Sequence, residues 1–389
     1  MRHGFTAVCL ASLTSLIAGL TLSGMEGRIQ AVKGLFVLIP VSIGMRGNIF
    51  GALSARLGTS IHMGLFEVGR DRGGVLMQNV FAATFLTMGT SVTIGLLSKA
   101  IAGLLGIETA SVWTFIAVAL AGGLLSSAVV MGATIFTSVT SHRRGWDLDS
   151  VGAPLITAIG DVVTLPCLFA ASFLAELGWI TEAFGIASLI GGFVALALGW
   201  TTALETTRRV VRESFPILCV AIVLDVLAGT VVQQRIETIF LAFTAYLIVI
   251  PGFLENTGAL GSILAARLGS KLHLGAVEPR ARPGAVALLD ASIVMALGVT
   301  VYVITASTTL GVSLLVGADY PSALRFVGSV LLGGMLATLV ASLIGYYAAI
   351  ATYRFGFDPD NHTIPLVTSG MDLLGMICLV TSLVVFGVA

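Results

Sequence analysis

The chain has 389 residues, of which 57% are hydrophobic and only 10% are charged, and its formal net charge is zero. A soluble domain carries about 25% charged residues, so this composition excludes a soluble protein. Zero net charge also provides no basic surface for nucleic acid, and we expect the lipid bilayer to be the main partner.

Apolar stretches long enough to cross a bilayer as helices recur from one end of the chain to the other. Five are predicted in the first half, at residues 5–23, 34–55, 76–98, 112–140 and 154–174. One further stretch, residues 184–204, precedes another five at residues 215–233, 243–266, 286–313, 323–351 and 365–388. The pattern predicts an all-α polytopic membrane protein with about 11 transmembrane helices.

The stretches on either side of residues 184–204 are two copies of one five-helix unit. At a constant offset of 211 residues Pro40 matches Pro251, and arginines, histidines, aspartates and further prolines match in the same register. The first helix of each copy fits less strongly, at an offset of 210 residues. Chance similarity between apolar stretches would not align charged residues and prolines at one offset. We predict a first unit at residues 1–178, a connecting helix and basic loop at residues 179–211, and a second unit at residues 212–389.

The connecting helix determines the predicted topology. Five crossings alone would invert the second unit, whereas one more crossing makes the two units parallel, related by a pseudo-two-fold axis along the membrane normal. Of the 20 Lys and Arg residues, fourteen lie on the side of the N-terminus and five on the other. Positive loops stay on the cytoplasmic side, so we predict a multi-pass protein of the cell membrane with a cytoplasmic N-terminus and an extracytoplasmic C-terminus.

Asp161 and Asp372 are matched aspartates inside the fifth stretch of each copy. A central Asp costs about 2.5–3.5 kcal/mol on insertion scales and therefore indicates function. Across a two-fold axis the two carboxylates can face each other, and a divalent cation would compensate their charges. Mg²⁺ suits one or two carboxylates with retained waters. The alternative is that each Asp caps or pairs locally within its own unit.

The second stretch of each copy carries prolines and glycines that we expect to interrupt the helix, and Asn48 and Asn256 lie near these breaks. Irregular backbone at membrane depth is tolerated where it is buried in protein or lines a cavity. These amides could therefore approach an ion or its water shell. The alternative is helix packing through small residues.

The copies differ in charge, because copy two carries Glu255, Asp290 and Asp225 where copy one has uncharged residues, and only copy one carries Arg46. We hypothesise that Arg46 and Glu255 approach each other and form a gate or coupling site; the alternative is that each reaches toward a membrane interface. The candidate pathway or coupling residues are Asn48, Asn256, Glu255, Arg46, Asp225, Asp290, Asn79, Thr157 and Thr368. Four further aspartates precede the fifth stretches and either attract cations to a cytoplasmic mouth or supply helix N-terminal charge: Asp147, Asp149, Asp358 and Asp360.

The pattern P-x-x-x-G-x-x-G-N at Pro40–Asn48 resembles the second helix of the MgtE-type magnesium channels and of solute carrier family 41. The segments DLDSVGAPLITAIGD, from Asp147, and DPDNHTIPLVTSGMDLLG, from Asp358, resemble the approach to the fifth helix of those proteins. The resemblance implies a metal site at Asp161 and Asp372 and two fused five-helix units, so that a single pseudo-dimeric chain suffices for transport. It does not extend to the regulatory domains of bacterial MgtE, and copy two reads E-N-T-G-A where the motif has G-x-x-G-N.

These features together predict transport of a divalent cation through a pathway at the pseudo-two-fold interface. Mg²⁺ is the favoured ion, and Mn²⁺, Co²⁺ and Ca²⁺ stay open. One alternative is a coupled antiporter in which Glu255, Asp225 or Asp290 carries Na⁺ or H⁺. A remote alternative is an intramembrane hydrolase with a carboxylate dyad, but no nucleophile–base pair stands out, and we expect no enzymatic activity.

Overall fold

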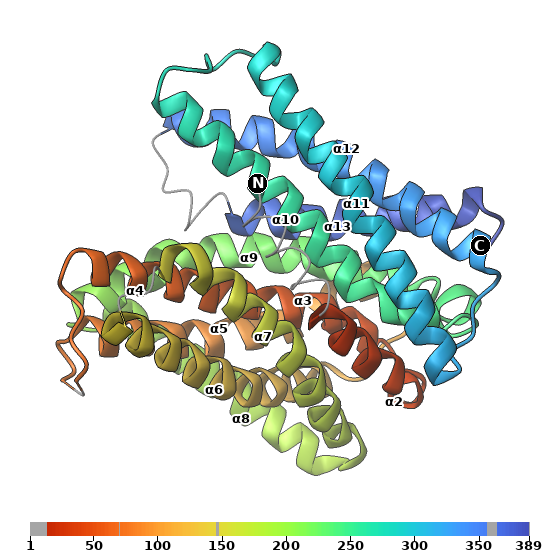
Figure 1. Cartoon of the computed structure of the whole chain (residues 1–389). Helices are drawn as coiled ribbons and strands as arrows, with labels where there is room; N and C mark the ends of the chain where they lie inside the picture. The colour runs from red at the N-terminus through yellow and green to blue at the C-terminus, as the bar shows by residue number, and fades with distance from the viewer. Residues whose placement is uncertain (1–13, 70, 145–147, 356–363, 389) are drawn as a thin grey trace. The chain divides into compact units, whose positions relative to one another are not determined.

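The computed structural model describes residues 14–69, 71–144, 148–355 and 364–388. Within these ranges the chain is helical and contains no strand (Figure 1). Ten of the described helices are long and apolar enough to cross a membrane, and the shorter apolar helix Thr14–Gly24 precedes them. The predicted all-α polytopic membrane protein is confirmed.

The helices follow the predicted order. Copy one contains, in addition to Thr14–Gly24, the helices α2 (Glu26–Ala31), α3 (Leu35–Arg46), η1 (Gly47–Gly51), α4 (Ala52–His62), α5 (Val75–Leu104), α6 (Val112–Arg144), α7 (Leu148–Ser172) and η2 (Phe173–Glu176). The connecting helix is α8 (Trp179–Thr201). Copy two contains α9 (Glu205–Gln233), η3 (Ile236–Phe240), α10 (Ala245–His273), α11 (Ala285–Val316), α12 (Ala323–Phe355) and α13 (Ile364–Val385).

Helix α9 begins at Glu205, earlier than the apolar stretch predicted from residue 215. The added turns are amphipathic, because Val210 and Val211 are buried while Arg209 and Arg212 are exposed. Hydropathy alone reports the apolar part of a helix and misses such a polar extension.

The chain divides in space into two compact parts, which we call the N bundle (Gly27–Thr230) and the C bundle (Met1–Glu26 with Val231–Ala389). This division differs from the division of the sequence into copies. The first helix of copy one belongs to the C bundle, and most of α9, the first helix of copy two, belongs to the N bundle. On the predicted division of the sequence into copies, the first helices are exchanged between the two bundles.

Glycines explain how each exchanged helix packs. A Cβ atom on Gly19 would lie 2.0 Å from the carbonyl oxygen of Ile248, and a Cβ atom on Gly229 would lie 2.8 Å from that of Val37. Only a residue without a side chain allows such a close backbone approach. Gly19 and Gly229 match at the offset of 210 residues, so the same helix contact occurs once in each bundle.

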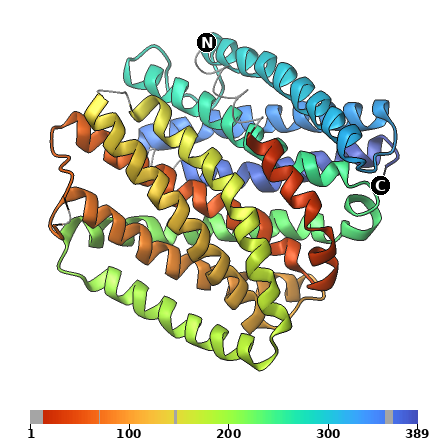
Figure 2. The ribbon, with the colours of Figure 1, turned by 60° about the horizontal axis from the view of Figure 1, so that its bottom comes forward.

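The second spans are the most enclosed. The most apolar window of Leu35–His62 is 72% buried and that of Ala245–Leu272 is 78% buried, whereas that of α8 is only 28% buried. Helix α8 therefore presents most of its surface outward, at the edge of the N bundle (Figure 2, light green). Its glycines Gly185, Gly192 and Gly199 pack against α6 and α5 at a seven-residue spacing.

The predicted interruption of the second span holds in copy one and is wrong in copy two. In copy one the five-residue π-helix η1 separates α3 from α4, whereas α10 is a continuous α-helix over its 29 residues. Pro251 lies inside α10 and Pro40 lies inside α3, so neither proline ends the helix that contains it.

Candidate functional site

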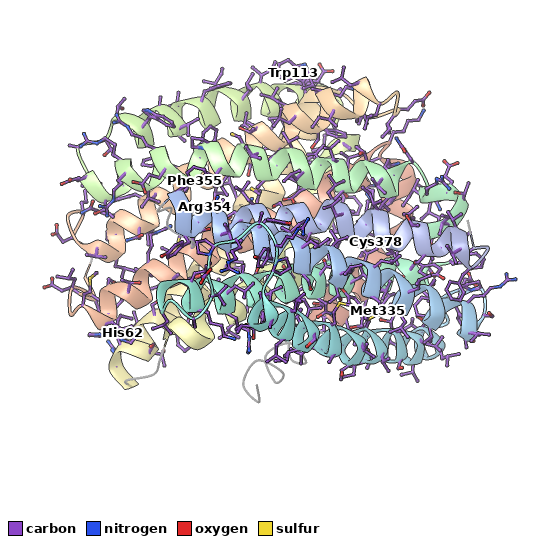
Figure 3. The ribbon with its side chains drawn as sticks, turned by 90° about the horizontal axis from the view of Figure 1, so that it is seen from above. His62, Trp113, Met335, Arg354, Phe355 and Cys378 are labelled. Carbon is purple, nitrogen blue, oxygen red and sulfur yellow. The ribbon has the colours of Figure 1, made fainter. Side chains whose placement is uncertain are left out.

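The helices that carry the predicted metal ligands, α7 and α13, are held by matched glycines on their neighbours. A Cβ atom on Gly122 of α6 would lie 3.2 Å from Cα of Leu168, and one on Gly333 of α12 would lie 3.1 Å from Cα of Leu379. Figure 3 labels Met335 on α12 and Cys378 on α13, and the carbonyl oxygen of Cys378 would lie 3.4 Å from the same Cβ atom on Gly333. Because the contacts match at the offset of 211 residues, α7 and α13 pack in the same way within their bundles.

Asp161 is 5% exposed in α7 of the N bundle. Asp372 is half-buried in α13 of the C bundle. Burial of a carboxylate at this depth requires compensation by hydrogen bonds or a cation. The approach of the two carboxylates across the axis stays a prediction.

Thr157 and Thr368 lie one helical turn before the two aspartates, over glycines of the second spans. A Cβ atom on Gly47 would lie 3.3 Å from Cγ2 of Thr157, and one on Gly258 would lie 3.5 Å from Cγ2 of Thr368. Thr157 also faces Gly51, whose Cβ would lie 3.6 Å from its hydroxyl oxygen. The fifth helix of each copy is thus closely packed on the second span one turn before its aspartate.

The two asparagines of the second spans have different surroundings. Asn48 lies half-buried within the π-helix η1. Asn256 is 1% exposed, and its Nδ2 donates a hydrogen bond to the hydroxyl oxygen of Thr305 on α11 at 3.0 Å. At the offset of 211 residues Asn256 matches Met45, not Asn48, so the two amides are not equivalent.

Arg46 is 1% exposed inside the N bundle. Its Nη1 donates hydrogen bonds to the carbonyl oxygen of Gly123, at 3.0 Å, and to the hydroxyl of Ser127, both on α6. Its Nε has no partner, and it forms no ion pair with a carboxylate among the described residues. The predicted approach to Glu255 joins residues of different bundles and stays a hypothesis.

Copy two places a different side chain beside the glycine that matches Gly123. A Cβ atom on Gly123 would lie 3.6 Å from Nη2 of Arg46 and 2.4 Å from Oγ of Ser91. At the matched Gly334 it would lie 2.2 Å from Cγ of Tyr302, the residue that matches Ser91. A guanidinium beside a small residue in one copy is therefore replaced by a phenol ring in the other.

Glu255 accepts a hydrogen bond from the hydroxyl of Ser15, which belongs to the exchanged first helix in the C bundle. In the N bundle, the residue that matches Ser15 is Asp225 of α9, which is fully buried. Each bundle therefore holds one acidic residue at this pair of matched positions, Glu255 of the second span in the C bundle and Asp225 of the first helix in the N bundle.

Asp290 is held by two cations. One carboxylate oxygen accepts hydrogen bonds from Arg267, at 3.2 Å from Nε and 2.6 Å from Nη2, and the other accepts one from Nζ of Lys271 at 2.5 Å. In copy one the matched acceptor is an uncharged amide: Nε of Arg56 donates a hydrogen bond to Oδ1 of Asn79 at 2.9 Å.

Lys271 matches Ser60, so copy two has both a carboxylate at Asp290 and an ammonium group at Lys271 where copy one has uncharged side chains. The net charge of this contact is therefore the same in both copies. The sequence prediction named Asp290 and Asn79 but missed their partners. The sequence signal for this contact was that both positions change together between the copies, from Asn79 to Asp290 and from Ser60 to Lys271.

The predicted cytoplasmic mouth falls outside the described part of the chain. Asp147, Asp358 and Asp360 are not among the described residues, and Asp149 lies in α7 without a described side chain. These four aspartates stay a prediction.

The duplicated packing and the ten long apolar helices among the described residues define a polytopic membrane protein built on a repeat. The family model of MgtE, described as a divalent cation transporter, matches residues 39–171 and 250–382, two segments separated by the predicted offset. The chain belongs to this family of divalent cation transporters. The hydrolase alternative is therefore abandoned.

The similar curated proteins belong to solute carrier family 41. Member 3 from Rattus norvegicus is 24% identical over 408 residues, covering 95% of this chain and 83% of the relative. Member 2 from Homo sapiens is 24% identical over 417 residues, covering 96% and 68%. Member 2 from Gallus gallus is 22% identical over 405 residues, covering 94% and 67%. No solved structure matches the chain.

Proposed function

We propose that the chain moves Mg²⁺ across the membrane along a pathway between its two copies, with Asp161 and Asp372 as metal ligands. One observation carries this proposal. The two aspartates occupy matched positions on α7 and α13, each one turn beyond a threonine packed on a glycine of the second span. A hard cation such as Mg²⁺ prefers carboxylate oxygens and retained water.

The remaining polar residues near these helices would guide the hydrated ion. Asn48, Thr157 and Thr368 supply neutral oxygens beside the second spans, and the aspartates at 147, 149, 358 and 360 would raise the local cation concentration at a cytoplasmic mouth. We propose a cytoplasmic N-terminus, a cell-membrane location and function as a single pseudo-dimeric chain.

A second candidate is coupled exchange of the divalent ion for Na⁺ or H⁺. The hydrogen bond between Ser15 and Glu255 favours Glu255 for this role, because the carboxyl group is accompanied by a neutral hydroxyl. Asp290 is disfavoured, since Arg267 and Lys271 already supply its counter-charge. Asp225 stays a candidate on account of its complete burial.

The proposal is tested by Mg²⁺ influx into proteoliposomes that contain a Mg²⁺-sensitive dye. We expect influx with the wild type, a loss of about 100-fold or more in the double variant Asp161→Asn/Asp372→Asn, and unchanged influx in Glu108→Gln, whose side chain lies in a loop. Full influx through the double variant would overturn the proposal. Competition by Mn²⁺, Co²⁺ and Ca²⁺ measures selectivity, and repeating the assay without Na⁺ or pH gradients separates a channel from an exchanger.

A further inference from the structure

The first turns of α9, on the surface of the N bundle, carry a stripe of charged side chains. The stripe lines a surface hollow of about 240 Å³, and its members are Glu205, Arg208, Arg209, Arg212 and Glu213. Residues three and four apart share one face of a helix, so all five side chains lie on the same side of α9. The two glutamates are the outermost members, and the three arginines between them are called the arginine cluster.

The helix that presents the arginine cluster is anchored on α5. The backbone N–H of Thr206 donates to Oε1 of Gln78 at 2.9 Å, and the hydroxyl of Thr207 donates to the carbonyl oxygen of Gln78 at 2.8 Å. Val210 and Val211 of the same turns are buried. The arginines therefore project from a helix segment that is fixed by its other side chains.

The arginine cluster has no internal counter-charge. None of its three members forms an ion pair with a carboxylate among the described residues, although two glutamates line the same hollow. Arg208 and Arg212 are four residues apart, a spacing at which like charges destabilise a helix. The packing of α9 gives no reason for three adjacent guanidinium groups, whereas guanidinium groups suit the recognition of phosphate.

The arginine cluster lies where a transmembrane helix leaves the hydrocarbon. The apolar part of α9 is predicted from residue 215, three residues after Arg212 and therefore about 4.5 Å further along the helix axis. Nε of Arg212 donates to the carbonyl oxygen of Trp200 at 3.1 Å, and the Trp200 side chain is exposed at the end of α8. Tryptophan is enriched at the level of the lipid headgroups, which places the cluster beside lipid phosphates.

An apolar surface for acyl chains begins at the same point. Phe193, Val194 and Leu198 of α8 are each more than half exposed, and α8 forms the edge of the N bundle (Figure 2, light green). The bond from Arg212 to Trp200 joins this apolar surface to the arginine cluster. A guanidinium has five N–H donors, so four donors of Arg212 stay available to a ligand.

We infer that the arginine cluster binds the phosphate of an anionic phospholipid whose acyl chains lie along α8. Charge complementarity selects an anionic headgroup, and the exposed apolar side chains of α8 select a lipid over a free anion. The cluster lies on the side of the membrane that we propose to be cytoplasmic, where basic sites beside transmembrane helices meet the anionic leaflet. The inference goes beyond the proposed function, because the partner is a membrane lipid and not the transported ion.

Titration of the purified full chain in detergent with phosphatidylglycerol or phosphatidylcholine of identical acyl chains, followed by native mass spectrometry, tests the inference. We expect the wild type to bind phosphatidylglycerol about tenfold or more tightly than phosphatidylcholine. The variant Arg208→Gln/Arg209→Gln/Arg212→Gln should lose this preference. The variant Arg209→Gln/Arg212→Gln changes only exposed side chains, so its folding is not in question, and it should lose most of the preference.

The matched control is Arg72→Gln/Arg280→Gln/Arg282→Gln, which removes the same charge from exposed loop residues on the same predicted side of the membrane. It should keep the preference of the wild type. Equal affinity of the wild type for the two lipids, or an equal loss in the control, would overturn the inference. Displacement of phosphatidylglycerol by an equal concentration of inorganic phosphate would also overturn it, because the cluster would then be a site for a free anion.

Discussion

Replacing Asp290 by Asn should destabilise the C bundle without removing ion coupling. The Asp290 side chain is 1% exposed, while those of Arg267 and Lys271 are 37% and 30% exposed. Removing one partner of a fully buried pair costs about 3–5 kcal/mol, and exposed pairs are worth about 0–1 kcal/mol. Because both cations retain part of their hydration, we expect a loss of about 1–3 kcal/mol for Asp290→Asn.

The matched contact in copy one suggests a second substitution that should restore stability to Asp290→Asn. There Arg56 bonds to Asn79 and the position of Lys271 is occupied by Ser60. The double variant Asp290→Asn/Lys271→Ser therefore rebuilds a contact that this chain already contains, and it should recover at least half of the lost stability, a coupling of about 1 kcal/mol.

Thermal unfolding of the wild type, both single variants and the double variant in detergent measures this coupling. Proteoliposome assays on the same proteins should show unchanged dependence of Mg²⁺ influx on Na⁺. The reasoning is refuted if Asp290→Asn is as stable as the wild type, or if the double variant is less stable than Asp290→Asn.

Three further predictions concern other contacts. Gly19→Ala should destabilise the chain by about 1–3 kcal/mol, because the added methyl group overpacks the helix contact. Gly24→Ala on the same helix should be tolerated, because a Cβ atom there would meet nothing within 4 Å. Equal thermal stabilities of the two variants would contradict the helix exchange. The free energy of unfolding of Arg46→Met should lie within about 1 kcal/mol of that of the wild type, because the substitution removes a buried charge that has no carboxylate partner among the described residues. Arg46→Ala should lower the free energy of unfolding by about 2–5 kcal/mol, because it leaves a cavity. A reversed order would show that the charge itself stabilises the bundle. Nζ of Lys33 donates a hydrogen bond to Glu108 at 2.5 Å, which lowers the pKa of the Glu108 carboxyl and raises the pKa of the Lys33 amine. The difference in stability between the wild type and Glu108→Gln should therefore be present above the ordinary carboxyl pKa and vanish as the pH falls through the lowered pKa. A difference that persists in acid would contradict the pairing.

The sequence predicted the order of the membrane helices because each property that decides it is local. Apolar length predicts a crossing, and the matched prolines, arginines and aspartates at an offset of 211 residues reveal the duplication. Asp161 and Asp372 were proposed as metal ligands in the same way, since a charge in an apolar stretch is conspicuous without any knowledge of its neighbours, and this role stays a prediction.

The exchange of first helices could not be predicted from either copy alone. Gly19 and Gly229 mark a close helix contact, but a glycine in a sequence does not say which copy supplies the partner. Continuity of α10 was also missed, because packing in the folded chain holds Pro251 inside a regular helix, which the sequence of this segment does not show. The partners of Asp290 lie on another helix, so only the matched change from Ser60 to Lys271 between the copies hinted at them.

The central claim is that Asp161 and Asp372 belong to one ion pathway. It is tested most directly by replacing both with Cys in a variant whose native cysteines are Ser, and by measuring block of Mg²⁺ influx by Cd²⁺. We predict that the double-Cys protein retains a reduced influx and is blocked at a Cd²⁺ concentration about 100-fold lower than either single-Cys protein, because two thiolates bind a soft metal together. Equal sensitivity of the single and double variants would contradict a shared pathway.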